Sequence, residues 1–471
     1  MEITKGLVGF LVEGNLDKMP QEVVYRGKEL VLNIIGTTLV GSVHRPSDVV
    51  IDYVRQLGGN PQATVLGKKN FKTSAASAAL ANAVSAHALE YDDNTFDVMI
   101  GHPSCSIVPA LLALGEELGS SGRDILEAYI LGFETGIKLA KGFQVEVKKG
   151  FLNSAYLKGW HTTGTLGMIM SAAACAKLAK LSSEKTAKTF GIVGSMAGAV
   201  RANMHTETNP LHTGNAAMWG VLAASLAKRG VDSTSTMFDD IYGYCDVRVG
   251  NENIQKKAVE VALESDTYSM LNPGMGVKYY PTATAQHAAM ENTMDIVKKH
   301  DIKPDQVESI ECGTTNVGPD IGRIKEPKTA REGQYSMPYC IAISVVDREI
   351  GIKQFYDERV FDPVVRSLMA KVKTYVHPDL MTLDAHYVGE NYITIRLKDG
   401  SEFKGHTVRN KGYTEAGGKI IGTHPHEELL DKFRECAGYV LPKDKIERSI
   451  ELVDRLEAVP HIGELIELLL V

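Results

Sequence analysis

Hydrophobic and polar positions follow a helical pattern over residues 1–268 of the chain. In 124–141 and 209–228, apolar side chains recur every three or four residues, which is typical of helices with one buried face. The Ala-rich stretches 74–89 and 164–181 carry small side chains on nearly every face, and small side chains let helices pack closely. We therefore expect a helical domain with these two stretches at its centre.

A different pattern begins at residue 269. In 392–408, apolar and polar residues alternate on both sides of Asp399-Gly400, a pair that supplies the two-residue turn typical of a β-hairpin. The other elements expected here are a strand at 306–314 and helices at 335–346 and 362–373. The mixture predicts an α+β domain over residues 269–407.

The helical pattern returns in residues 408–471. Thr423 suits a helix cap, and the apolar segment 462–470 needs a partner surface, so we expect this part to pack back on residues 1–268. The predicted fold class is therefore mostly α. Both chain ends form one all-helical domain, and the α+β domain is inserted between them.

Composition narrows the choice of partners. The chain has 51 Lys and Arg against 58 Asp and Glu, a net charge of −7, which gives no support for a nucleic-acid or anionic-membrane partner. No apolar run reaches the roughly 18 to 20 residues of a membrane span, and the N-terminus lacks a signal-peptide pattern. The six cysteines lie far apart without a C-x-x-C pair, so we expect them reduced in a cytoplasmic protein.

Familiar cofactor motifs are missing from the sequence. It has no G-x-G-x-x-G between a strand and a helix, no Walker A sequence, no H-E-x-x-H and no G-x-S-x-G. A metal-dependent hydro-lyase would need a cluster of His, Asp and Glu ligands, and only His424 and His426 have near spacing, at a predicted helix cap. We therefore expect no metal and no organic cofactor.

An acidic cluster follows the first Ala-rich helix and lies close in sequence to a histidine. The cluster contains Glu90, Asp92 and Asp93, and Pro103 opens the next helix directly after His102. A helix N-terminus favours neutral imidazole and attracts anions, which suits acid–base chemistry on an anionic substrate. The alternative is that the acids are solvated loop residues and His102 is a helix cap.

Further polar residues stand at helix entrances and at the join between the predicted domains. His161 lies beside hydroxyls and glycines at a helix start, where it suits either a general acid or base or a hydrogen-bonded core histidine. For His212, hydrogen bonding within the fold is the favoured interpretation. Lys278 lies at the domain join, where clefts form, and segment 334–339 of the insert can face it.

Six segments in the same order along the chain resemble the MmgE/PrpD family, over almost the whole length. They are a helix at 20–42, H-A-L-x-Y-D-D at 87–93, H-P-S at 102–104, G-x-H at 159–161, P-L-H-x-G-N-A-A at 210–217 and Q-Y-S-x-P-Y at 334–339. The resemblance implies a helical domain with an inserted α+β lid, a homodimer formed through the helical domain, and no cofactor. It also implies proton-transfer chemistry on a small polycarboxylate.

The family's active-site pattern is kept at several positions. The resemblance assigns catalytic roles to His102, His161 and the lid residue Tyr339, and it matches the paired acids Asp92 and Asp93, of which we expect Asp93 to be catalytic.

Other positions depart from the pattern. Glu90 stands for the family's Asp, Asn94 for Thr, Asn209 for Lys and Ala283 for His, and we expect the first three to bind substrate. Losing the Lys removes a positive charge that would pair with a substrate carboxylate.

Three other cations can compensate for that loss, namely Lys158, Arg201 and Lys278. Of these, we predict Lys158 and Lys278 as substrate-binding residues.

The leading hypothesis is a lyase that removes a proton α to a carboxylate and eliminates water, as in 2-methylcitrate dehydration. His102 or His161 would be the base, and Tyr339 or the other histidine the acid. Decarboxylation of the cis-aconitate type and epimerisation of the iminodisuccinate type are alternatives within one site. A non-catalytic protein that binds a carboxylate is an alternative of a different class.

Overall fold

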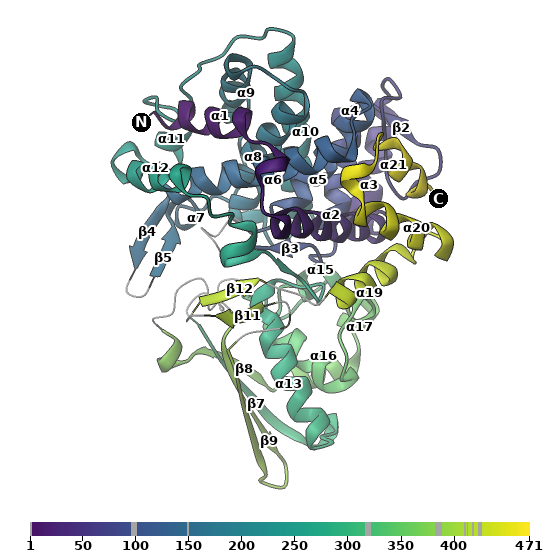
Figure 1. The fold of residues 1–471 in the computed structure, drawn as a ribbon. Coiled ribbons are helices and arrows are strands. Elements are labelled where there is room, and N and C mark those ends of the chain that lie inside the picture. The colour runs from purple at the N-terminus through teal and green to yellow at the C-terminus, as the bar shows by residue number, and fades with distance from the viewer. Residues whose placement is uncertain are drawn as a thin grey trace.

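The computed structural model describes residues 2–95, 101–147, 150–315, 322–381, 389–408, 411, 413–416, 419–422 and 426–471. Over these residues the protein is mostly helical, and its strands form small sheets (Figure 1). The predicted mostly-α fold class is confirmed. The cap expected at Thr423 and the spaced histidine His424 lie outside the described residues.

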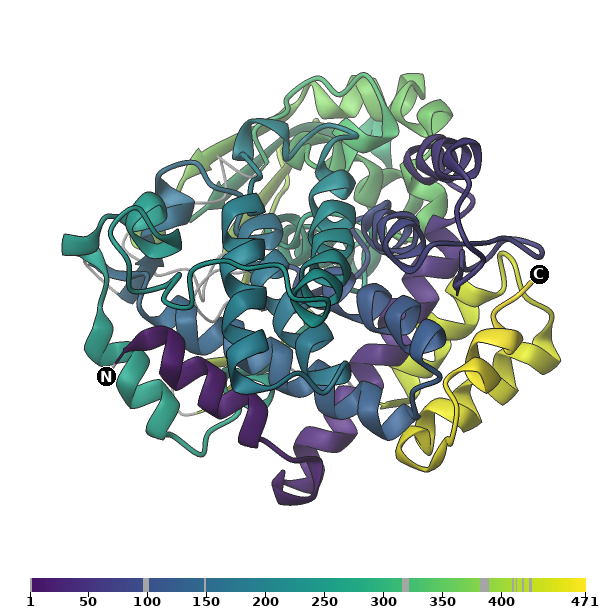
Figure 2. The same cartoon turned by 90° about the horizontal axis from the view of Figure 1, so that it is seen from above.

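Helices from both ends of the chain form the upper part of the protein in Figure 1, which we call the helical body. Its core is one cluster of buried side chains from residues 3–277 and 429–469. Seen from above, the yellow C-terminal helices lie beside the purple α2 (Figure 2). The principal helices of the body are α1 (Ile3–Glu13), α2 (Gln21–Gly41), α3 (Arg45–Leu57), α4 (Ala75–His87), α5 (Ser104–Leu118), α6 (Gly122–Lys141), α8 (Thr162–Leu178), α9 (Ser183–Met196), α10 (Asn209–Lys228), α12 (Lys256–Glu264), α19 (His426–Ala437), α20 (Lys443–Asp454) and α21 (Gly463–Leu468).

The Ala-rich helices α4 and α8 pack against α10 in the core of this body. These contacts leave no room for larger side chains. A Cβ added at Gly220 of α10 would lie 2.6 Å from the Cβ of Ser171 on α8, and one at Gly214 would lie 2.6 Å from Val84 on α4. Small residues therefore fix the short distances between the helices whose ends carry the polar segments.

The insert has its own core and a four-stranded sheet. The strand order is β10-β9-β7-β8, with β7 parallel to β8 and the other pairs antiparallel. Along β9, buried Ile393, Ile395 and Leu397 alternate with partly exposed residues, and α13 packs against β9 and β10. The elements are α13 (His287–Lys299), β7 (Val307–Thr314), α15 (Ala330–Gly333), α16 (Met337–Asp347), α17 (Asp357–Val360), α18 (Pro363–Met369), β8 (Val372–Val376), β9 (Asn391–Leu397) and β10 (Glu402–Thr407).

Most elements predicted for the insert are confirmed, and one is wrong in its second half. The hairpin is β9 and β10, with Gly400 at φ +88° in its turn. The helix predicted over 362–373 ends at Met369, and β8 begins at Val372. Val372 pairs in parallel with Ile310 of β7, and a local pattern does not reveal such a long-range partner.

Short strands join the body to the insert. β3 (Asp93–Asn94) pairs antiparallel with β6 (Gly276–Val277), which places the acidic cluster directly beside the start of the insert. A small buried cluster that includes Leu89 and Tyr91 of the body and Ile352 of the insert lies at the same border. We keep the domain limits 1–268, 269–407 and 408–471, and the action of the insert as a lid, as a proposal.

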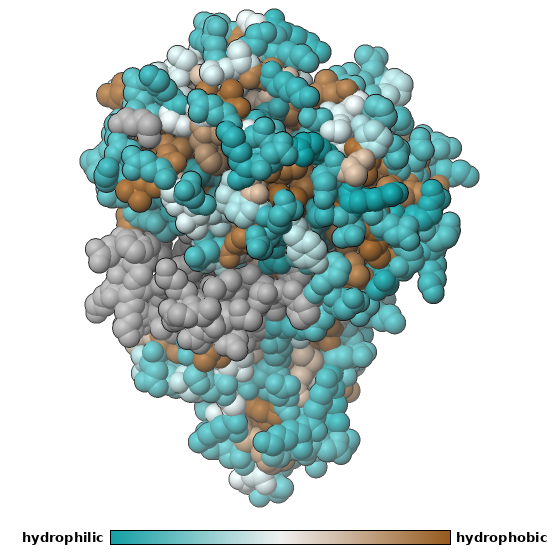
Figure 3. Space-filling view, viewed as in Figure 1, coloured by the Kyte–Doolittle hydropathy of each residue, from teal (hydrophilic) through white to brown (hydrophobic). Residues whose placement is uncertain are grey.

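The surface shown in Figure 3 is mostly hydrophilic, with hydrophobic residues scattered among polar ones. Among the described residues, no helix combines the length and the apolar character that a membrane crossing requires.

Candidate active site

A cavity that is partly open to solvent lies where the helical body meets the insert, and its empty space, counting the open solvent at its mouth, is about 660 Å³. The body supplies most of its wall, and the insert supplies residues 283–285 and Tyr335. The lining residues are Glu90, Asn94, Thr95, Gly101, His102, Tyr156, His161, Thr162, Thr163, Met204, Asn209, Ala283, Thr284, Ala285 and Tyr335. Polar residues from separate helix starts thus meet in one cavity.

The turn after α4 directs the acidic cluster toward this cavity. α4 ends at His87, and Glu90 then takes φ +54°, in the left-handed region that side chains other than glycine seldom adopt. β3 follows at once and fixes Asp93 and Asn94 by its pairing with β6. The short distance from helix end to strand leaves the intervening carboxylates buried.

Glu90 is the most heavily contacted carboxylate of the site. Its Oε1 accepts hydrogen bonds from the Tyr335 hydroxyl, from Asn209 Nδ2 at 3.1 Å and from Arg331 Nη2 at 3.3 Å. Its Oε2 accepts from Lys278 Nζ at 2.6 Å. Burial acts to raise the pKa of Glu90, but the charges of Lys278 and His87 outweigh burial and hold that pKa well below its usual range.

His87 bridges two carboxylates and is charged. Its Nδ1 lies 2.8 Å from Asp92 Oδ2, and its Nε2 lies 3.1 Å from Glu90 Oε1. Burial opposes the imidazolium, but Glu90 and Asp92 together raise the pKa of His87 to about 9. Lys278 also lies 3.4 Å from Asp92 Oδ1, so this side of the cavity is a compact network of ions.

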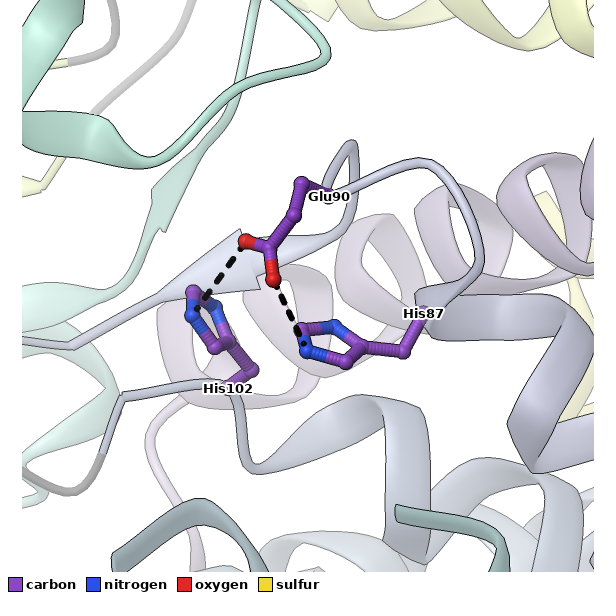
Figure 4. A group of neighbouring side chains, drawn as sticks. All are labelled: His87, Glu90 and His102. Atoms are coloured by element: carbon purple, nitrogen blue, oxygen red, sulfur yellow. Dashed lines mark ion pairs between the residues drawn. The ribbon is translucent and has the colours of Figure 1, made fainter. Parts of the chain in front are cut away.

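His102 faces the same carboxylate but is neutral. Figure 4 shows the imidazoles of His87 and His102 on either side of the Glu90 carboxylate, with His102 Nε2 3.7 Å from Oε2. His102 Nδ1 lies 2.7 Å from the backbone oxygen of Asp93. A carbonyl oxygen only accepts, so Nδ1 carries the proton and Nε2 keeps a free lone pair. Burial and the charge of Lys278 lower the pKa of His102 to about 4.

A second histidine pair lies on another side of the cavity. His161, directly before α8, and His212, in the first turn of α10, place their Nδ1 atoms 2.8 Å apart. One Nδ1 must therefore donate and the other accept. Burial and His212 hold the pKa of His161 well below its usual range, and burial lowers the pKa of His212 to about 4. Both rings of this pair are neutral at pH 7.

The structure brings together several of the residues expected at the site. His102, His161, Glu90, Asn94 and Asn209 all line the cavity. These are two of the four expected catalytic residues and three of the five expected substrate-binding residues.

Asp93 and Lys278 lie behind the cavity wall. Lys278 is fully buried against Glu90. Asp93 is also fully buried, and burial together with the charge of Asp92 raises its pKa to about 7. Asp93 contributes its backbone oxygen to His102, as described above.

Tyr339 and Lys158 are placed elsewhere. The Tyr339 hydroxyl donates to the backbone oxygen of Gln354, and Tyr335 lines the cavity in its place. Lys158 is exposed and donates to the backbone oxygen of Val249 at 2.8 Å. Arg201, weighed as a compensating cation, donates to the backbone oxygen of Tyr156 at 3.1 Å.

Sequence reasoning missed Arg331, Tyr335 and the ionised state of His87. Tyr335 belongs to the Q-Y-S-x-P-Y segment, where the later tyrosine was chosen instead. Arg331 lies in α15 and Tyr335 just after its end, where the Arg331 guanidinium donates to the Tyr335 hydroxyl at 3.2 Å. The charge of His87 depends on two carboxylates that only the folded turn brings to its ring.

Three of these side chains also have a spacing that suits a metal ion. Ligand atoms of His87, Glu90 and His102 all lie within 4.8 Å of one another, as do those of His87, Asp92 and Cys105. However, Lys278 Nζ already lies 2.6 Å from Glu90 and 3.4 Å from Asp92, so an ammonium ion balances these carboxylates. A metal at this place would meet the Lys278 ammonium at close range, and the donor set does not fit a metal well.

Comparison with known proteins identifies the family of this chain. The chain matches the models of the MmgE/PrpD N-terminal domain over residues 5–257 and of the MmgE/PrpD C-terminal domain over residues 280–458. The chain belongs to the MmgE/PrpD family. The cavity of this family member lies where residues of both matched regions meet.

Curated relatives extend along nearly the whole chain. It is 28% identical to a cis-aconitate decarboxylase of Mus musculus over 99% of this chain and 93% of the relative. The identity is 28% with that of Homo sapiens, over 96% and 91%, and 25% with that of Aspergillus terreus, over 96% and 93%. These relatives are enzymes, and we describe this family member as an enzyme. Their names agree with the decarboxylase alternative better than with the dehydratase hypothesis.

Proposed function

We propose that this enzyme is a lyase that decarboxylates a small polycarboxylic acid with its own side chains. The observation that carries the proposal is the pair of neutral imidazoles, His102 and His161, on one cavity. A neutral imidazole can accept a proton, and an anionic substrate beside it raises its pKa toward moderate pH. The cavity is small enough to orient a small acid between the two rings. The similarity to cis-aconitate decarboxylases supports the choice of reaction.

In this reaction the bond between a substrate carbon and its carboxylate breaks. Carbon dioxide leaves, the electron pair stays on the substrate, and a proton must reach a carbon atom. We assign that proton to His161. The bound anionic substrate raises the pKa of this ring, so that it takes up a proton from solvent and donates a proton from Nε2 as an imidazolium, while its Nδ1–H donates to His212 Nδ1. Transfer of the Nε2 proton to carbon returns His161 to the neutral state. The hydroxyls of Thr162 and Thr163 lie on the same wall and can orient the acid.

Elimination of water is the second candidate, and one observation favours it. The free lone pair on His102 Nε2 suits the removal of a proton α to a carboxylate. An anionic substrate close to this ring would raise its pKa and strengthen it as a base. Epimerisation and simple binding of a carboxylate are tested by the turnover experiment described in the next paragraph.

The experiment is turnover in deuterium oxide followed by NMR. The panel is cis-aconitate, citrate, 2-methylcitrate, iminodisuccinate, malate and itaconate, together with saturated and unsaturated dicarboxylates. We expect release of carbon dioxide and one deuterium in the product, and a His161→Asn control that lacks both. Turnover with loss of water would favour the second candidate. Absence of turnover on every acid, in a folded protein, would contradict both.

A homodimer and a cytoplasmic location remain predictions of the family resemblance and of the sequence. Light scattering of the purified protein would test the dimer.

A further inference from the structure

The side-chain amide of Asn209 has its nitrogen and its oxygen in different surroundings. Its Nδ2 donates to Glu90 Oε1 at 3.1 Å, to the Met204 backbone oxygen at 2.8 Å and to the Tyr335 hydroxyl at 2.7 Å. A carboxylate and a backbone oxygen only accept, so the nitrogen must lie on this side of the amide. The amide oxygen, Oδ1, therefore lies on the other side, away from these partners.

This oxygen is an acceptor without a donor. Asn209 is 1% exposed, and its Oδ1 has no hydrogen-bond partner among the described residues. An unpaired buried acceptor is costly, and nearly all buried polar groups in proteins meet a partner from the protein, water or a ligand. Because Asn209 lines the cavity, a bound ligand can supply the missing donor.

A second lining residue also has an unpaired polar atom. Among the described residues that line the cavity, only Asn209 Oδ1 and the Thr284 hydroxyl oxygen are buried side-chain atoms without a hydrogen-bond partner. Both residues lie beside Tyr335. Asn209 donates to the Tyr335 hydroxyl, and the backbone N–H of Ala283, directly before Thr284, donates to the backbone oxygen of Gln334 at 3.2 Å. The helical body and the insert thus each bring one unpaired atom to this side of the cavity.

We infer that Asn209 makes this enzyme select a substrate that carries a hydrogen-bond donor, a hydroxyl or an amino group, in addition to its carboxylates. The inference rests on the proposed function and narrows its substrate class. The family pattern has Lys at this position, and an ammonium group only donates, so it suits an acceptor such as a carboxylate. Asn209 presents an acceptor instead, and the ligand group that meets it must donate. The Thr284 hydroxyl can complete the contact by donating to the same ligand group.

Isothermal titration calorimetry with acids that differ by one group tests this inference. Glutarate would be compared with 3-hydroxyglutarate and 3-aminoglutarate, and propane-1,2,3-tricarboxylate with citrate. In at least one comparison we expect the acid with the donor to bind at least about tenfold more tightly, since an unpaired buried acceptor corresponds to roughly a factor of ten in affinity. The hydroxyl and amino acids distinguish the two donors. Equal affinities in every comparison, tighter binding of the acid without the donor, or binding of none of these acids would overturn the inference.

The variant Asn209→Lys removes the acceptor and keeps the donors. A lysine ammonium can still donate to Glu90 and Tyr335, so the contacts on that side are retained. The preference for the acid with the donor should therefore fall about tenfold or reverse. A folded Asn209→Lys enzyme with the wild-type preference would contradict the role assigned to Asn209.

Thr284→Val is a milder variant, because it keeps the shape of the side chain and removes only the hydroxyl. The preference should fall about threefold or more. Thr293→Val is the matched control. Thr293 is fully buried in α13, donates to the backbone oxygen of Ala289 at 2.7 Å and lies outside the cavity lining, so the preference of this variant should equal that of the wild type. Equal preferences in both variants would overturn the contact assigned to Thr284.

The binding preference is measured at equilibrium and does not require turnover. Failure of decarboxylation with the preference intact would refute only the proposed function. Decarboxylation without the preference would refute only the selection by Asn209.

Discussion

Two buried histidines on different sides of the cavity, His87 and His161, have opposite charge states. His87 is fully buried, and His161 is 3% exposed. Glu90 and Asp92 raise the pKa of His87 to about 9, whereas burial beside His212 lowers the pKa of His161 far below its usual range. Burial alone makes a histidine neutral, and two carboxylates within hydrogen-bond distance reverse that result.

Because of this difference, the two sides of the cavity have different roles. On the side of Glu90, charges are paired with one another and fix the position of the body against the insert. On the side of His161, the neutral rings keep a lone pair that can accept a proton once an anionic substrate raises their pKa. Proton transfer needs neutral groups such as those around His161. The paired charges around Glu90 hold together the two parts of the chain that enclose the site.

The largest expected effect comes from Lys278→Met, which breaks the ion network. Glu90 and Asp92 would each lose a cation in a fully buried place, and removing one partner of a buried ion pair costs about 3–5 kcal/mol of stability. Urea unfolding would measure the loss. Lys158→Met is the control, because Lys158 is exposed, and its effect should stay within about 0.5 kcal/mol. Equal effects of both substitutions would show that the network is not a stabilising element.

Next in size is the loss of activity in His102→Asn. An asparagine amide can still donate to the Asp93 backbone oxygen, but it lacks the lone pair that Nε2 offers. If His102 takes part in proton transfer, turnover should fall about 10²–10⁴-fold with stability nearly unchanged. A loss below tenfold would remove His102 from the chemistry and leave it as a structural group.

The charge of His87 predicts a pH effect on stability of about 3 kcal/mol. Its folded pKa of about 9 lies above the ordinary 6.5, so the folded protein holds an additional proton between these values. This stabilisation is complete below pH 6.5 and is lost as the pH rises through about 9. The difference in unfolding free energy between wild type and His87→Gln should therefore shrink from pH 6 to pH 10, measured at each pH by urea unfolding. A constant difference would mean that His87 is not charged.

For His212, on the other side of the cavity, the pH dependence of stability has the opposite sign. The folded pKa of His212, about 4, lies below 6.5, so its share of stability is complete above pH 6.5 and falls as the pH is lowered toward 4. His212→Asn should reduce this acid-side loss.

The smallest effect is expected from the partner of His161. His212→Leu removes the ring atom that fixes the tautomer of His161, and kcat should fall about tenfold with KM unchanged, corresponding to roughly 1.4 kcal/mol. His212→Asn retains a polar atom near the position of Nδ1 and should recover most of the rate. If Asn and Leu behave alike, His212 acts only in packing.

The local sequence predicted most helices and strands, because helix periodicity and turn residues depend only on neighbouring positions in the chain. The periodicity of 209–228 predicted α10 at Asn209–Lys228, and Asp399-Gly400 predicted the turn between β9 and β10. The helix predicted to reach residue 373 failed where β8 pairs with a strand about sixty residues away. Backbone pairing over such distances depends on partners that local propensity does not contain.

The sequence by itself also identified the reactive side chains of this enzyme, namely the histidines and the acidic turn, and the family to which the chain belongs. Only the tertiary structure decided which of them meet and in what state of charge. Tyr335 lines the cavity and Tyr339 does not, because adjacent turns of chain place their hydroxyls on different partners. Protonation depends on distances of a few ångströms between residues such as Glu90 and Lys278, which lie 188 positions apart in the sequence.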